Sequence, residues 1–418
     1  MDIGKTKFIR KAIEILEDNR KEGYTIPSEK LYPFQWNWDS SFITFGLVTA
    51  DEEKSKDEIR KLLSAQWKNG MIPHIIFWED GDYFPGKKEW EIKIKGIHTS
   101  GITQPPIIVH SVHNIFKKTG DVKFLKKHLP RLENLLNWWL AERSEDQALV
   151  YVRHPWETGM DNSPAWDEAL ASINPKDIFY KRRDIIHSSS SEHRPLTWDY
   201  DRYIYLLRQA KLMNWDEFKI KKVCPFLIED ILTNSIFINA CFKLSEIFEM
   251  VGNNSKRYKW LNQAKKSQKK ARSKLWNANI QNFVSYNLIQ SKQIPINSIA
   301  GLISTYGNIP NEEQCNALMK NISDNFSEFK YIVPSYVGNQ LALERYWRGP
   351  IWINTNWMLF IGLQNYGKFN LADKIKKNSI KLIEKNGFYE YFNPKTGHGI
   401  GANNFSWTAA LYLDFLEN

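Results

Sequence analysis

Cysteine is scarce in this sequence of 418 residues. The three cysteines, Cys224, Cys241 and Cys315, lie far apart and form no CxxC pair. This excludes a disulfide framework and a cysteine-based zinc site, and it favours a reducing compartment. The sequence has no run of about 18 consecutive apolar residues, and its charged N-terminal stretch lacks the apolar core of a signal peptide. We therefore expect a cytoplasmic protein that does not cross or bind a membrane.

Motifs for several kinds of chemistry are also missing. There is no glycine-rich phosphate loop and no GxSxG nucleophile elbow. His110 and His113 lie three residues apart on one helix face, but no third metal ligand accompanies them, which favours a core or capping role. The sequence thus predicts neither a metal site nor a bound cofactor.

The net charge of +10 has no single focus, because lysines are spread along the chain and mixed with glutamates. The densest basic runs, at 265–270 and 374–381, have the spacing of solvated helix faces. A general cationic surface is therefore favoured over a nucleic-acid site, while an anionic small substrate remains compatible.

Aromatic residues, in contrast, are abundant: 17 Trp, 18 Tyr and 23 Phe. Some must fill the core. Others stand in stretches without helical spacing, namely Trp36, Trp38, Trp78, Trp90, Trp156 and Trp166. Flat apolar sugar faces stack well on such rings, so a carbohydrate ligand is a reasonable hypothesis.

Hydrophobic spacing predicts an all-α fold of roughly a dozen helices. Apolar and amphipathic segments alternate, as in the pairs 38–50 with 51–68 and 350–366 with 369–386. There is almost no convincing strand and no sequence repeat of fixed period, which argues against an open solenoid. The count and length fit a single domain, 1–418, folded as an (α/α)6 barrel. Long loops should form its pocket at one end: 70–103, 144–166, 387–404 and a Ser-rich, mobile flap at 180–198.

The loop 154–167 is the most unusual stretch. It holds three carboxylates and two Trp, and Pro155, Gly159 and Pro164 interrupt it too often for a helix or strand. Asp161 follows Met160, and an apolar setting would raise its pKa into the range of a general acid. The alternative is a buried aspartate that caps a helix or holds the loop together. Glu157, four residues before Asp161, is interpreted as orienting the loop.

A partner carboxylate is found in the loop 387–404, where Glu390 stands among several aromatic residues. It could equally anchor a turn by accepting backbone N–H bonds. Two carboxylates on facing loops of an aromatic pocket are what glycoside hydrolysis requires. Their separation decides between inversion and retention, and the sequence leaves it open.

Seven blocks, in order over residues 35–410, resemble glycoside hydrolase family 63, within it the compact bacterial branch of mannosylglycerate and glucosylglycerate hydrolases. These blocks are QWNWDS at 35–40, YFPG at 83–86, SGITQPP at 100–106, ETGMDNSP at 157–164, YWRGPIWIN at 346–354, EYFNP at 390–394 and NFSWTAA at 404–410.

The resemblance implies an (α/α)6 barrel and an inverting α-glycosidase without a catalytic metal. It implies that Asp161 is the general acid and Glu390 the general base. For the cleaved sugar, the resemblance implies binding by Trp38 and Asp39, with Trp347, Arg348 and Trp352 lining that subsite. For the glycerate group, it implies Tyr83, Gln104 and Arg194, an arginine on the flap. Further substrate-binding candidates from the same blocks are Trp36, Gly159 and Trp407.

Three departures from the family pattern bear on glycerate specificity. Thr158 stands where serine is common, Ala165 where arginine is common, and a charged insert spans Lys87–Gly96. We predict hydrolysis of a small α-glucoside or α-mannoside, glucosylglycerate or mannosylglycerate first. The alternatives are an α-glucosidase for another glucoside or oligosaccharide, a sugar epimerase, or a non-catalytic sugar-binding protein. The matched blocks contain no histidine pair, which counts against an epimerase. Homo-oligomerisation stays open.

Overall fold

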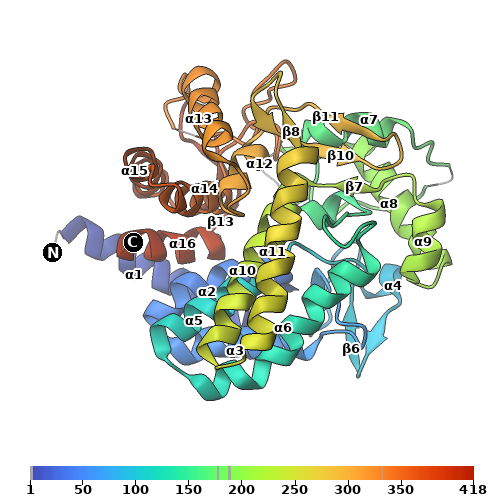
Figure 1. Ribbon diagram of the computed structural model, residues 1–418, viewed down its shortest axis with the longest axis horizontal. Helices are drawn as coiled ribbons and strands as arrows, with labels where there is room; N and C mark the ends of the chain where they lie inside the picture. The colour runs from blue at the N-terminus through green and yellow to red at the C-terminus, as the bar shows by residue number, and fades with distance from the viewer. Residues whose placement is uncertain (1–2, 177, 187–189, 332) are drawn as a thin grey trace.

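The protein is built mainly from α-helices that pack in pairs. The computed structural model describes residues 3–176, 178–186, 190–331 and 333–418 (Figure 1). The helices on the inside are α2 (Asn37–Ala50), α5 (Ile108–Thr119), α10 (Ile231–Met250), α12 (Ile299–Leu302), α14 (Ile353–Asn365) and α16 (Ser406–Glu417). Each contacts the next in this order, with the 3-10 turn η4 (Ile303–Thr305) helping α12 bridge α10 and α14, and α16 returns to α2.

A second set of helices covers this ring from outside. It comprises α1 (Ile3–Asp18) on α16, α3 (Glu52–Ser64) on α2, α6 (Val122–Glu142) on α5, α11 (Asn254–Lys274) on α10, and α15 (Phe369–Asn386) on α14. In the remaining sector lies α13 (Glu312–Asn321), continued by the π-helical turn η5 (Ile322–Phe326). The alternation of apolar and amphipathic segments in the sequence is this alternation of inner and outer helices.

The pair α2 and α3 shows how the sequence produces this arrangement. Residues 37–48 of α2 are all buried, since α3, α5 and α16 surround the helix. α3 is amphipathic and begins where the Asp51 side chain accepts a hydrogen bond from the Lys54 backbone N–H, the predicted N-cap. His110 and His113 lie inside α5, where they contact Tyr306 and Glu246, and this confirms their core role.

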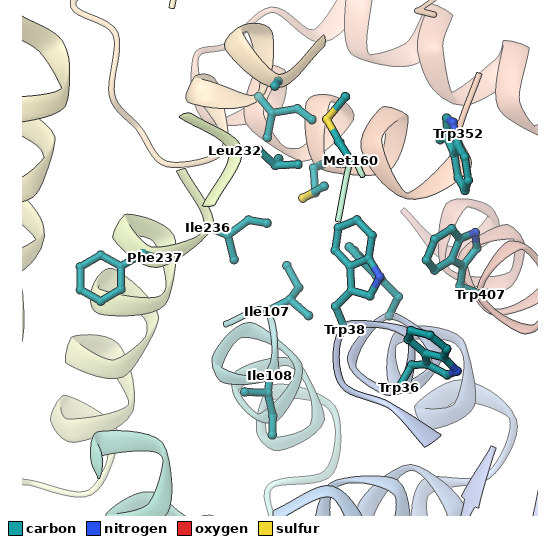
Figure 2. Packing of buried hydrophobic residues seen from close by; sticks show 14 of the residues in the cluster. Trp36, Trp38, Ile107, Ile108, Met160, Leu232, Ile236, Phe237, Trp352 and Trp407 are labelled. Atoms are coloured by element: carbon teal, nitrogen blue, oxygen red, sulfur yellow. The ribbon is translucent and has the colours of Figure 1, made fainter. Parts of the chain in front are cut away.

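The centre of the ring is apolar and leads into a cluster of tryptophans. Figure 2 shows Leu232 and Ile236 of α10 facing Ile107, with Trp38 next to them and Trp407 beyond. Each fully buried aliphatic side chain of this kind contributes roughly 1.5–3 kcal/mol. Among the described residues, α10 has the length and composition of a membrane span, but 83% of its most apolar window is buried inside the protein.

The expectation of an all-α fold is confirmed only in part, because the described part of the chain also holds five small antiparallel sheets. The largest has the order β3-β4-β6-β5, from Gln35–Trp36, Ile75–Phe77, Ile97–Thr99 and Lys93–Ile94. A hairpin pairs β12 (Tyr389–Phe392) with β13 (Gly399–Asn403). The others join β1 (Arg20–Lys21) with β2 (Tyr24–Thr25), β7 (Ile228–Glu229) with β10 (Ser285–Asn287) and β11 (Lys292–Ile294), and β8 (Trp276–Asn277) with β9 (Asn282–Phe283). These strands have two to five residues, too few for an alternating pattern to stand out.

Further helices lie in the remaining connections: the 16-residue α8 (Thr197–Leu212) and the shorter α4 (Lys87–Trp90), α7 (Asp167–Ala171) and α9 (Glu217–Val223). The 3-10 turns are η1 (Pro155–Thr158), η2 (Pro164–Trp166) and η3 (Ser191–His193). The predicted flap at 180–198 contains η3 and the start of α8, and its residues 187–189 lie outside the described part of the chain. Its mobility stays a prediction.

Candidate active site

One cavity collects most of the residues that the sequence singled out. It encloses about 620 Å³ of space, including its opening to solvent. All four predicted loops contribute to its lining, together with the first turns of α2 and α16. The predicted residues on its wall are Trp36, Trp38, Asp39, Tyr83, Gln104, Gly159, Asp161, Arg194, Trp347, Glu390 and Trp407.

The acid loop, which we define as residues 154–167, turns sharply around Gly159. The ring of His154 accepts a hydrogen bond from the Trp156 backbone N–H and starts η1. Gly159 then has a φ of 75°, and a Cβ at this position would lie 2.2 Å from the Trp38 ring. Only glycine tolerates both the left-handed backbone and this close approach. The turn brings Asp161 beside Trp38 on the cavity wall.

Two bidentate arginine pairs fix the ends of the acid loop. The fully buried Arg143 donates to both carboxylate oxygens of Glu157, each at 2.8 Å. Arg348 holds Asp167 in the same way, at 2.8 and 2.7 Å. Burial would raise the pKa of Glu157, but Arg143 and Arg153 hold it at about 2. Glu157 therefore stays charged and orients the loop, as the sequence suggested.

Asp161 itself is left nearly without donors. Among the described residues, no other residue donates a hydrogen bond to its carboxylate, and only its own backbone N–H interacts with it. Burial raises the pKa of Asp161 to about 7, and the opposing charge of Arg194 only partly counters this. A carboxylic acid that keeps its proton near neutral pH suits a general acid.

Glu390 occupies the β12–β13 hairpin, where the strand pairing shifts between Tyr389 and Tyr391. Its carboxylate accepts hydrogen bonds from the Tyr32 hydroxyl at 2.7 Å and from the Ala402 backbone N–H at 3.1 Å. Burial raises its pKa, while Arg194 and Tyr32 act in the opposite direction. These donors stabilise the charged form that a general base requires.

Asp39 is a third carboxylate in the same cavity. Burial raises its pKa well above the ordinary value, and the nearby charges of Glu390 and Asp161 raise it further. The adjacent Trp38 is held at the start of α2, where its backbone N–H donates to the Gln104 side chain at 3.1 Å. Three carboxylates in one small cavity favour a ligand that brings hydrogen-bond donors or a cation.

Arg194 is the cation that faces these carboxylates. Its guanidinium is almost fully buried, lies over the Tyr346 ring at 4.2 Å, and contacts Asp184 through Nε at 3.4 Å. Its Nη1 is 3.5 Å from Glu390 Oε1 but makes no hydrogen bond to any described residue. Since buried donors normally have partners, Nη1 is available to an acceptor on a ligand.

The cavity wall carries further unused donors. The indole N–H groups of Trp36, Trp347 and Trp407 are buried and have no hydrogen-bond partner within the described ranges. Figure 2 shows Trp36, Trp38 and Trp407 grouped together at one side of the apolar centre. An aromatic wall with free N–H donors can stack on a sugar ring and also bind its hydroxyl groups.

Two residues predicted to line the sugar subsite, Arg348 and Trp352, are not among the residues that line the cavity. The Arg348 guanidinium is engaged within the protein, by the Asp167 carboxylate and by the Asn162 backbone carbonyl. Trp352 stacks on the outer face of Trp347, with ring centroids 3.7 Å apart. They support the acid loop and the wall instead.

Trp156, one of the aromatics singled out in the sequence, also lines the cavity. Sequence reasoning missed the rest of the lining, which is Tyr32, His74, Ile75, Pro85, Tyr200, Tyr346 and Phe405. Tyr346 and Phe405 stand within the matched blocks, so their position was a usable signal. His74 had no such signal. It faces Ser100 through Nδ1, and burial lowers its pKa well below 6.5, so it carries no charge at neutral pH.

No group of three or more His, Cys, Asp or Glu in the described part of the chain could hold a metal ion. The cavity brings three carboxyl groups, Asp39, Asp161 and Glu390, together with a buried arginine along an aromatic wall. Such a site can give a proton to a leaving oxygen and take one from water.

Comparison with known proteins agrees with this geometry. The family model for the mannosylglycerate hydrolase MGH1-like glycoside hydrolase domain matches residues 32–408. A mannosylglycerate hydrolase from Rubrobacter radiotolerans is 36% identical over 97% of this chain and 96% of its own. A glucosylglycerate hydrolase from Mycolicibacterium hassiacum is 31% identical over 98% of each chain.

Solved structures give the same result. The crystal structure of the GH63 mannosylglycerate hydrolase from Thermus thermophilus, in complex with Tris and D-glycerate, has a TM-score of 0.93 at 34% identity, over 98% of this chain and 100% of that one. Neutral trehalase from Saccharomyces cerevisiae shares the fold, with a TM-score of 0.61 at 16% identity, over 94% of this chain and 73% of that one. The chain therefore belongs to the MGH1-like family of glycoside hydrolases and is a glycosidase.

Proposed function

We propose that the protein is an inverting α-glycosidase that hydrolyses the glycosidic bond of mannosylglycerate or glucosylglycerate. The observation that carries the substrate is the Arg194 guanidinium, a buried cation on the wall of the aromatic cavity whose Nη1 makes no short hydrogen bond and lies 3.5 Å from Glu390. A neutral glycoside leaves Nη1 with only its 3.5 Å ion pair to Glu390, whereas a glycerate carboxylate gives it a hydrogen-bond acceptor. The names of the relatives at 31–36% identity support the same substrates.

In this mechanism Glu390 and Asp161 act on opposite sides of the anomeric carbon. Glu390 takes a proton from water as the water oxygen bonds to that carbon. The bond to the glycerate oxygen breaks, and Asp161 donates its proton to that oxygen. The different donors around the two carboxylates support these roles. Tyr32 and the Ala402 N–H favour the anion of Glu390 against the effect of burial, whereas burial raises the pKa of Asp161 to about 7.

The glycerate group is assigned to Arg194, Tyr83 and Gln104, as the family resemblance implies. The side-chain oxygen of Gln104 accepts the Trp38 N–H, which leaves its Nε2 able to donate to a ligand. Burial raises the pKa of Tyr83, so its hydroxyl stays protonated and can also donate. The sugar is assigned to Trp38, Asp39 and the indoles of Trp36, Trp347 and Trp407.

For the fold, we propose a single (α/α)6-barrel domain over residues 1–418. The order of contacts around α2, α5, α10, α12, α14 and α16 supports a closed ring of six inner helices. The five outer helices that cover individual inner ones, with α13 in the sixth sector, support the second layer. The trehalase, which shares this fold, is compatible with the same assignment.

The test is to incubate the protein with α-mannosylglycerate, α-glucosylglycerate and the corresponding methyl α-glycosides, and to follow the released sugar by NMR. We expect a glycerate conjugate to be hydrolysed with the highest kcat/KM and the β-anomer to appear first. Release of the α-anomer would contradict inversion. Equal kcat/KM for methyl glycosides and glycerate conjugates would contradict the role of Arg194.

Arg194→Gln separates recognition of glycerate from catalysis. The variant should lose about 10- to 100-fold in kcat/KM for the glycerate conjugate, since one charge-assisted interaction contributes about 1.5–3 kcal/mol. Its kcat/KM for a methyl glycoside should fall less. Arg182→Gln is the control, because Arg182 pairs with the same Asp184 but does not line the cavity. An equal loss of kcat/KM for both substrates would mean that Arg194 acts only on Glu390 and does not bind the glycerate carboxylate.

A further inference from the structure

A second cavity lies directly beside the catalytic one. It encloses about 1030 Å³ of space, including its opening to solvent, and Tyr83 and Pro85 line both cavities, so the two are neighbours across these side chains. Its walls come from α4, from the stretch that precedes the flap's η3 turn and from α8. Figure 1 shows α4 and α8 on the same side of the molecule, and an ion pair between Lys211 of α8 and Glu91 after α4 joins them.

The charge of this outer cavity is strongly positive. Five cations face it, Lys88, Lys181, Arg183, Arg208 and Lys211, against two carboxylates, Asp82 and Glu89. The rest of its lining is largely apolar or aromatic, with Phe84 stacked on Tyr180 at a centroid distance of 5.4 Å. An apolar wall lowers the effective dielectric constant and strengthens the field of the surrounding cations.

The two carboxylates are already committed to other partners. Asp82 pairs with Arg183 at 2.6 Å, and Glu89 accepts the Gly86 backbone N–H at 2.6 Å, which caps α4. Lys88 and Lys181, in contrast, have no carboxylate partner among the described residues. Arg183 and Lys211 are ion-paired, with Asp82 and Glu91, so within the described part of the chain Lys88 and Lys181 contribute the positive charge of this lining that no carboxylate pairs with.

Lys88 belongs to the charged insert Lys87–Gly96, which departs from the family pattern and has no role in the catalytic cavity. The insert folds into α4 and β5, and it places Lys88 and Glu89 on the outer cavity while Trp90 is buried beneath them. The charged insert therefore builds one wall of the cationic cavity.

We propose that the outer cavity is a binding site for a phosphate group. A phosphate carries nearly two charges and several acceptor oxygens, which match a cluster of lysine and arginine donors better than one carboxylate does. The phosphate comes either from a substituent on the aglycone of a substrate that sits in the catalytic cavity, or from free inorganic phosphate. The first source rests on the proposed function, whereas the second does not.

The binding test uses inorganic phosphate and the full-length protein. Phosphate should bind to the wild type in the millimolar range by calorimetry, and the double variant Lys88→Gln/Lys181→Gln should bind it about 3- to 10-fold more weakly, as two partly exposed charges are lost. Lys93→Gln/Lys95→Gln is the matched control, because these two lysines stand on the same insert outside the cavity. Equal affinity in all three proteins, or no binding in the wild type, would overturn the proposal.

A kinetic test distinguishes the two sources. If the phosphate belongs to the substrate, a glycoside with a phosphate on its aglycone has a higher kcat/KM than the same glycoside without it. That advantage disappears in Lys88→Gln/Lys181→Gln and persists in the control. If the advantage is missing but phosphate still binds through these lysines, the site takes free phosphate.

The same experiments separate this site from the catalytic proposal. Phosphate binding that depends on Lys88 and Lys181, without hydrolysis of any α-glycoside, would leave the outer site intact and contradict the proposed function. Hydrolysis of a glycerate conjugate, together with phosphate binding that is unchanged in Lys88→Gln/Lys181→Gln, would support the proposed function and contradict the outer phosphate site.

Discussion

The acid loop and the β12–β13 hairpin hold their carboxylates in opposite ways. The acid loop makes its ion pairs at Glu157 and Asp167, on either side of Asp161, and gives Asp161 only its own backbone N–H. The hairpin places Glu390 within reach of the Tyr32 hydroxyl and the Ala402 N–H. Both carboxylates share one cavity, so burial acts on both.

The difference teaches how one cavity can supply both an acid and a base. Burial raises the pKa of both carboxyl groups, and the hydrogen-bond donors decide which group then loses its proton more readily. Rigidity is supplied elsewhere: the acid loop is fixed through neighbours of Asp161, so that Asp161 itself needs no donor.

The largest effect should come from removing either carboxylate. Asp161→Asn and Glu390→Gln should each lower kcat for a glycerate conjugate by about 10²- to 10⁴-fold. With an α-glycosyl fluoride, whose leaving group needs little protonation, Asp161→Asn should recover most of its rate while Glu390→Gln should not. Equal recovery in both variants would mean that the roles of general acid and general base are assigned wrongly. Undiminished hydrolysis of the glycerate conjugate by Asp161→Asn would mean that Asp161 is not a catalytic residue.

The next largest effect concerns the stability of the acid loop. Arg143→Met leaves Glu157 charged and fully buried without its bidentate partner. The free energy of unfolding, measured in urea, should therefore fall by about 3–5 kcal/mol. Arg348→Met is the matched change at the other end of the loop, where the pair with Asp167 is partly exposed. It should lower the free energy of unfolding by about 1 kcal/mol. A larger loss from Arg348→Met would reverse our view of which end of the loop is fixed more firmly.

Tyr32→Phe tests the hairpin side of the comparison. The substitution removes the hydroxyl that donates to Glu390 at 2.7 Å, so the pKa of this carboxylate should rise and the acidic limb of the kcat/KM profile should move to higher pH. Tyr203→Phe is the control, since its hydroxyl donates to the Asp161 backbone carbonyl and not to a carboxylate. If the acidic limb moves equally in both variants, the hydrogen bond from Tyr32 does not set the pKa of Glu390.

The smallest effect is on thermal stability. The pKa of Asp161 is raised in the folded state to about 7 from 3.8, so the folded protein binds this proton more tightly, and stability falls as the pH rises through this range. Asp161→Asn removes the charge. Its Tm should match the wild type near about pH 4 and exceed it by about 1–3 °C near pH 8. A constant difference at both pH values would mean that burial of the Asp161 charge is not the cause.

Much of the site was predictable because its residues stand in short, distinctive blocks. Asp161, Glu390, Trp38 and Gly159 were identified from their local composition and family resemblance, and all four line the cavity. Tyr32 was not predicted, since nothing near it in the sequence points to Glu390, 358 positions away. Such a contact arises only when helices distant in sequence are brought together.

The sequence by itself determined the alternation of inner and outer helices, the loops that form the cavity and the candidate acid and base, because spacing and composition are local properties. Only the tertiary structure decided which arginine pairs within the acid loop and which one lies at the catalytic cavity. Arg348 was expected at the sugar but pairs with Asp167, whereas the guanidinium of Arg194 lies buried between Tyr346 and Glu390. A charged side chain is long enough to reach several partners, and only the folded chain fixes which of them lies within hydrogen-bonding distance.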